Sequence, residues 1–99
     1  MNGITLIRCI CDETRFEILE LLEERQEMCV NDFVSVMKKD QPLISHHLKT
    51  LKQCGIVKSK ADGKKMMYRI SSQQLMNLIT SVVQASKKIP VLCDDKNCC

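Results

Sequence analysis

Three cysteines fall within seven positions at the end of the sequence, Cys93, Cys98 and Cys99, in the pattern C-x4-C-C. Thiolates are soft ligands, and three of them on one short segment can surround a single soft ion without ligands from elsewhere. Trivalent arsenic or antimony takes three sulfurs in a pyramid, whereas zinc in a closed structural site needs a fourth ligand. The pattern therefore predicts a metal site for a soft ion, with arsenite or antimonite as the expected ligand, cadmium and lead as open alternatives, and no organic cofactor. The alternative is a polar terminal segment that binds nothing.

Two histidines, His46 and His47, are also potential ligands, but they are adjacent in sequence. On a helix, adjacent side chains point in different directions, so these two cannot chelate one ion together. We interpret His46 as an outward-facing residue, and His47 and Cys54 as structural residues beside an apolar stripe. The sequence shows no nucleophile paired with a base, no phosphate-binding loop and no paired carboxylates, so we expect no enzymatic activity.

The length of 99 residues predicts one small domain, which dimerisation would help to stabilise. There is no apolar run of the length needed to span a membrane and no secretory signal, so we expect a cytoplasmic protein without a membrane partner. The cysteine count of seven is odd. In a reducing compartment, clustered thiols more often bind metal or sense redox state than form structural disulfides.

Charge is distributed unevenly along the chain. Residues 1–37 carry three basic and eight acidic side chains, a net charge of −5, whereas residues 38–69 carry nine basic and two acidic ones, a net charge of +7. Residues 70–99 contribute +1, which gives the total of +3. A basic segment of this density is typical of a protein with a polyanion as its partner, although a solvated lysine face is the simpler alternative.

The elements that would position these residues follow from the hydrophobic pattern. In the segment that follows Pro42, Ile44, Leu48 and Leu51 recur at i, i+4 and i+7, and Gly55 is a good C-terminal stop. Asp62-Gly63 between two short apolar and basic runs indicates a β-hairpin. The predicted helices cover residues 4–11, 12–25, 29–40, 42–55 and 71–88, and the predicted strands cover residues 56–60 and 66–70.

The helices over residues 29–40 and 42–55 form a helix-turn-helix, whose second helix has a polar and basic outer face. A helix of this kind fits the major groove of DNA, and the basic hairpin after it can contact the backbone. The predicted DNA-binding residues are Gln41, Ser45, His46, Lys49, Thr50, Lys52, Gln53, Lys64 and Lys65.

Four stretches together resemble the ArsR/SmtB-type winged-helix repressors: DETRFEILELL, EMCVNDF, QPLISHHLKTLKQCGIV and DGKKMMYRIS. The resemblance covers about residues 5–87. It implies a mainly α fold with a β-hairpin wing, a homodimer built by the first and last helices, and a near-palindromic operator that is released when an inducer binds. We therefore expect a DNA-binding and dimerisation domain over residues 1–90 and a cysteine-rich tail over residues 91–99.

The resemblance also implies where an inducer would bind. One family site uses a C-V-C pair, and here that stretch reads Cys29-Val30-Asn31, which lacks the second thiolate. Another uses Asp, Glu and His on the last helix, and residues 72–88 contain none of these. Some arsenic-responsive members place cysteine triads near the end of that helix, as here. Cys9 and Cys11 are interpreted as small buried thiols, and they are candidates for additional thiolates from the partner protomer.

We thus expect a dimeric repressor that leaves operator DNA when the cysteine triad binds trivalent arsenic or antimony. Two alternatives remain open from the sequence. One is a repressor of the same fold whose thiols sense oxidants or persulfides. The other is a thiol-rich metal-binding module that does not bind DNA.

Overall fold

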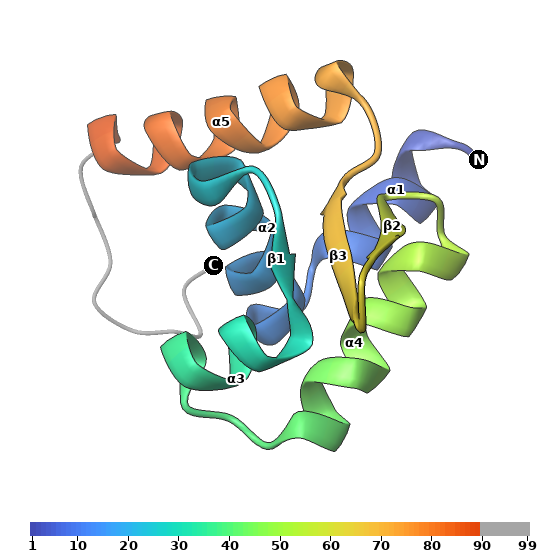
Figure 1. Cartoon of the computed structure of the whole chain (residues 1–99). Helices are drawn as coiled ribbons and strands as arrows, with labels where there is room; N and C mark the ends of the chain where they lie inside the picture. Colours follow the sequence, from blue (N-terminus) through green and yellow to red (C-terminus); the bar gives the residue numbers. More distant parts are fainter. Residues whose placement is uncertain (90–99) are drawn as a thin grey trace.

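The computed structural model describes residues 1–89, which form five α-helices and one three-stranded antiparallel sheet (Figure 1). In chain order, the elements are α1 (Gly3–Ile10), α2 (Glu13–Arg25), β1 (Met28–Cys29), α3 (Val30–Met37), α4 (Gln41–Gln53), β2 (Val57–Asp62), β3 (Lys65–Ile70) and α5 (Gln73–Lys88). The predicted mainly α fold with a β-hairpin wing is confirmed.

Polar side chains fix the first turns of four helices. Asn2, Asp12 and Ser72 each accept a hydrogen bond from the backbone N–H three residues further on, at 2.8, 3.0 and 3.2 Å. These N-caps satisfy N–H groups that have no partner within the helix. Helix α3 begins differently, because Cys29 is its N-cap and the Asp32 carboxylate accepts a hydrogen bond from the Cys29 N–H at 3.1 Å.

One apolar cluster forms the core beneath the helices and the sheet. Its buried members are Ile18, Leu19, Leu22, Met28, Phe33, Met37, Ile44, Leu48, Leu51, Ile56, Val57, Ile70 and Ile79. The predicted stripe of α4 is confirmed, since Ile44, Leu48 and Leu51 are all fully buried. No charged or polar residue is buried in the described part of the chain. The apolar faces of the helices therefore hold the fold together.

The sheet has the order β1-β3-β2, and its hairpin agrees with the prediction. Asp62 pairs with Lys65 across a two-residue loop in which Gly63 has a φ of +63°, a backbone conformation that glycine adopts without steric cost. Strand β1 was not predicted. It contains only two residues, paired with Tyr68 and Met67 of β3, and two residues are too few to show an alternating pattern.

Helices α3 and α4 form the predicted helix-turn-helix. The chain leaves α3 through Lys38, which has a left-handed φ of 54°, and enters α4 with Pro42 in its first turn. Figure 1 shows α5 along one side of the molecule, with α3 and α4 on the other. Within residues 1–89, no helix has the length and apolar character required to cross a membrane.

Candidate nucleic-acid interface

Helix α4 presents a polar face opposite its buried stripe. Among the residues predicted on this helix, those that are exposed are Gln41, His46, Lys49, Lys52 and Gln53. Ser45 and Thr50 are half-buried, and the Thr50 hydroxyl donates to the His46 carbonyl oxygen at 3.1 Å. That hydroxyl is therefore already engaged within its own helix. The polar face of α4 therefore carries two basic groups, an imidazole and two amides, which are groups that can contact base edges and phosphates.

The β2–β3 hairpin, which we term the wing, carries Lys64 and Lys65 at its tip, and both are exposed. A direct contact joins the wing to α4, because the Lys52 ammonium donates to the Ser59 hydroxyl at 2.7 Å. The helix and the wing therefore lie on one continuous polar surface. Lysine side chains at such positions neutralise phosphates and fix the register of a protein on a duplex.

His47 lies on the inner flank of α4, as its place on the helix predicted. Its side chain is 14% exposed, and its Nδ1 lies 4.0 Å from the Asp12 carboxylate. Burial lowers the pKa of His47, and the negative charge of Asp12 opposes this shift. The pKa of Asp12 is itself lowered, first by the hydrogen bond from the Arg15 N–H and then by the charge of His47. His47 thus packs α4 against the start of α2.

Basic residues on the wing strands also contribute positive surface, and they were not among the predicted DNA-binding residues. Lys58 and Lys60 are exposed on β2, and Arg69 is exposed on β3 directly opposite Lys58. The signal that would have found the two lysines is the alternation of β2, which places both on the same face of the strand. Leu43, in the first turn of α4, was also not among the predicted DNA-binding residues, although its side chain is 41% exposed.

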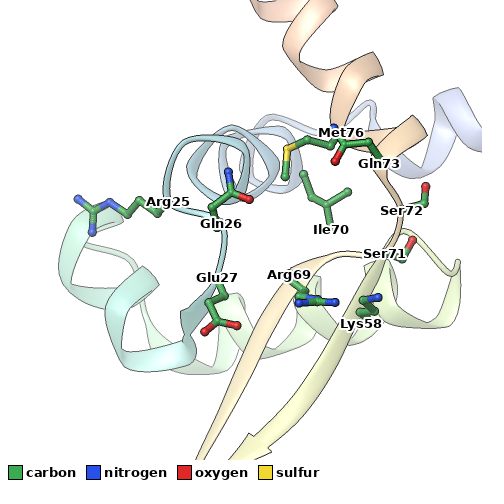
Figure 2. A pocket seen from close by; sticks show the side chains of 10 residues that line it. All are labelled: Arg25, Gln26, Glu27, Lys58, Arg69, Ile70, Ser71, Ser72, Gln73 and Met76. Atoms are coloured by element: carbon green, nitrogen blue, oxygen red, sulfur yellow. The ribbon is translucent and has the colours of Figure 1, made fainter.

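A groove of about 660 Å³ lies at the base of the wing, between the end of α2 and the start of α5. Figure 2 shows Arg25 and Glu27 on the α2 side and Lys58 and Arg69 on the strands. Three of these four charged groups are basic. The groove therefore extends the positive surface of the wing strands towards α2.

The predicted thiol site at Cys93, Cys98 and Cys99 lies outside the described residues. Of the two candidates for additional thiolates, Cys9 is half-buried and Cys11 is exposed. The interpretation of Cys11 as a buried thiol is therefore wrong, because Cys11 is the C-cap residue that follows the last turn of α1. Within residues 1–89, no three His, Cys, Asp or Glu side chains are arranged to hold a metal ion.

Comparisons with known proteins agree with this geometry. Residues 12–59 match the family model described as "Bacterial regulatory protein, arsR family". An uncharacterized HTH-type transcriptional regulator of Methanocaldococcus jannaschii is 40% identical over 77 residues, which are 78% of this chain and 86% of that protein. The arsenical resistance operon repressor of Escherichia coli K12 is 40% identical over 68 residues, which are 69% of this chain and 58% of that repressor.

Among solved structures, the chain is similar to a homodimeric winged helix-turn-helix DNA-binding domain from Mycobacterium bovis, described as a possible ArsR-family regulator. The TM-score is 0.75 at 25% sequence identity, and the match covers 84% of this chain and 77% of that domain. The similarity therefore extends over most of the chain, and the related domain has the same winged helix-turn-helix fold.

Proposed function

Because this chain belongs to the arsR family of bacterial regulatory proteins, we propose that it is a dimeric repressor that releases operator DNA on binding trivalent arsenic or antimony. The family and the relatives are transcriptional regulators and not enzymes. In this proposal, residues 1–90 bind DNA and form the dimer, and residues 91–99 bind the inducer.

The observation that carries the DNA-binding role is the continuous polar and basic surface of α4 and the wing. His46, Lys49 and Gln53 occupy the outer face of α4 and would meet base edges and phosphates in a major groove. Lys64 and Lys65 at the wing tip would contact phosphates beyond that groove. In this role α4 is the recognition helix.

A dimer is supported by apolar side chains that point away from the core on α1 and α5. Ile4 and Ile7 are more than half exposed on α1, and Leu78 and Val82 are exposed on α5. Groups of exposed apolar side chains often mark an interaction site. A two-fold dimer would place two recognition helices on half-sites about 34–36 Å apart.

The inducer site in the proposal consists of Cys93, Cys98 and Cys99. Its support is the chemistry of three thiolates, which suits a soft trivalent ion, together with 40% identity to an arsenical resistance operon repressor. Cys11, which is exposed, remains a candidate fourth thiolate from a partner protomer.

In the proposed mechanism, the three thiolates draw the tail onto the end of α5 when they bind the ion. This would shift the dimer interface and change the separation of the two recognition helices. Couplings between sites in proteins are typically about 1–3 kcal/mol, which is enough to lower the occupancy of an operator substantially. A small rotation of one protomer against the other is enough to weaken DNA binding, because both recognition helices must fit into the major groove at the same time.

DNA binding is tested by fluorescence anisotropy with the DNA upstream of the protein's own gene, over a range of salt concentrations. We expect binding that weakens steeply as salt increases, because phosphate contacts release counterions. The absence of salt-sensitive binding would contradict the proposal and favour a thiol-rich module that does not bind DNA.

Inducer binding is tested by titrating reduced protein with arsenite and following sulfur-to-arsenic absorption and DNA release together. Wild-type protein should bind one arsenic per monomer, and a variant with serine at positions 93, 98 and 99 should stay on DNA. Cys29→Ser is the matched control, because Cys29 is a buried N-cap and serine caps helices well. Equal release of the triple variant would refute the assignment of the site. A mass loss of two hydrogen atoms without added arsenic would favour redox sensing.

A further inference from the structure

Two cysteines outside the proposed inducer site, one in α1 and one at the end of α4, lie next to each other. The Sγ atoms of Cys9 and Cys54 lie 2.7 Å apart, although the residues are separated by 45 positions in sequence. Cys9 is in the last turn of α1, and Cys54 is the C-cap of α4. Both residues are half-buried, and neither is in a disulfide.

This separation is closer than the packing of two small apolar side chains requires. Carbon atoms in good van der Waals contact lie about 3.5–4.0 Å apart, and sulfur is larger than carbon. A disulfide bond measures about 2.05 Å, so less than one ångström of movement would bring these atoms to bonding distance. The other described thiols differ, because Cys11 is exposed and Cys29 is buried as the N-cap of α3.

We propose that Cys9 and Cys54 are a dithiol modification site, which oxidants of the hydroperoxide class convert into an intrachain disulfide that joins α1 to the end of α4. The proposal does not depend on the tail cysteines or on any bound ion.

The chemistry assigns different roles to the two sulfurs. The hydrogen bond with Cys9, followed by burial, raises the pKa of the Cys54 thiol, and the positive charge of Arg15 opposes this shift. The Cys54 thiol therefore holds its proton more tightly, and we assign the attack on the peroxide to the Cys9 sulfur. Cleavage of the O–O bond leaves a sulfenic acid on Cys9 and releases one molecule of water.

The second step closes the bond. The Cys54 sulfur displaces the hydroxyl group of the sulfenic acid, which leaves as a second water and takes up the Cys54 proton. In total, two thiols and one hydroperoxide give one disulfide and two waters (or one water and one alcohol from an alkyl hydroperoxide). The two sulfurs together lose two electrons, and the peroxide gains them.

The location of the site leaves it accessible in the proposed dimer. Cys9 and Leu6 pack towards the core on α1, whereas Ile4 and Ile7 point outwards. An interface built on the outward residues would therefore not cover the thiol pair. Because the bond would hold α4 to α1 in the arrangement already seen, oxidation should stabilise the fold and not unfold it.

The test uses the full chain with serine at positions 93, 98 and 99, so that tail thiols cannot react. Reduced protein is treated with one equivalent of hydrogen peroxide, its mass is measured, and it is digested with trypsin without a reductant. We expect a loss of two hydrogen atoms per chain and a cross-link between the peptides of residues 9–15 and 53–58. Dithiothreitol should reverse both changes.

Single variants identify the sulfurs, because the first peptide contains both Cys9 and Cys11. In the same background, Cys11→Ser should keep the cross-link, whereas Cys9→Ser and Cys54→Ser should abolish it. Far-ultraviolet circular dichroism of each reduced variant checks that it is folded. The melting temperature provides a second measurement that needs no variant, and it should rise by roughly 10 °C or more on oxidation of the parent protein.

Three outcomes would overturn the proposal: a cross-link that persists in Cys9→Ser, a peroxide adduct without any cross-link, or a melting temperature that falls on oxidation. None of them would affect the proposed inducer site, because the tail thiols are absent from the test protein. Loss of the arsenite response in the triple serine variant would likewise leave this proposal intact.

Discussion

The carboxylate of Asp12 interacts with two helices, α2 and α4. It caps α2 by accepting from the Arg15 N–H, and its oxygen lies 4.0 Å from His47 on α4. Asp40 stands at the same position of α4 but makes no side-chain capping hydrogen bond. The two residues therefore allow the effect of a formed cap to be separated from that of residue type.

Replacement of Asp12 with alanine should lower the free energy of unfolding by about 1 kcal/mol at neutral pH, since the cap is removed. Asp40→Ala is the matched control and should cost much less. Urea denaturation of both variants measures the difference. Equal losses of stability in Asp12→Ala and Asp40→Ala would show that the capping hydrogen bond of Asp12 does not stabilise the protein.

The pH dependence of the same variant has a definite sign. The folded pKa of Asp12 is lowered from 3.8, so the stabilisation by its charge is present above that value and is lost as the pH falls through the folded pKa. The stability gap between wild type and Asp12→Ala should therefore shrink between about pH 5 and about pH 2. Urea titrations at several pH values measure it, and a gap that widens in acid would contradict this assignment.

At the scale of elements, Gly55 ends α4 with a φ of +78°, a conformation that side chains rarely adopt, and open space surrounds the position of its absent Cβ. Gly3, in α1, is also surrounded by open space but has an ordinary φ. Gly55→Ala should therefore destabilise the protein by about 1 kcal/mol through backbone strain alone. Gly3→Ala should stabilise it by roughly 0.5–1 kcal/mol. Thermal unfolding of both variants tests the opposite signs.

The wing should contribute to DNA affinity through charge. With Lys64 and Lys65 replaced by alanine, binding should weaken, and the slope of log K against log salt should decrease by about 0.9 for each phosphate that the wing no longer neutralises. Lys87 and Lys88 in the last turn of α5 provide a control with the same change of charge. An equal effect of both double variants would indicate a role for net charge and not for the wing.

The elements that the sequence predicted well are those with a repeated pattern or a turn residue of special conformation. The stripe of Ile44, Leu48 and Leu51 located α4, and Asp62-Gly63 located the hairpin. Strand β1 could not be predicted, because its two residues form a strand only by pairing with β3. The approach of Cys9 to Cys54 is a tertiary contact over 45 positions, so no local pattern encodes it.

On the scale of the whole molecule, the outward apolar residues of α1 and α5 should decide the oligomeric state. Ile7→Glu combined with Leu78→Glu would place charges in the proposed interface and should convert the dimer into a monomer with weaker operator binding. Val36→Glu on α3 is the control, because the side chain of Val36 is also apolar and is 41% exposed. Helix α3 is not part of the proposed interface, which α1 and α5 form. Sedimentation velocity measures the change. If the double variant remained dimeric, the interface would lie elsewhere.

The exposed side chains of α1 and α5 also affect how the regulator responds to its own abundance. If protomers combine only through these faces, the concentration of dimer rises with the square of the monomer concentration while most of the protein is unpaired. Operator occupancy would then depend more steeply on gene dosage and protein turnover than it would for a monomeric regulator. A modest fall in synthesis could open the promoter before any inducer is present.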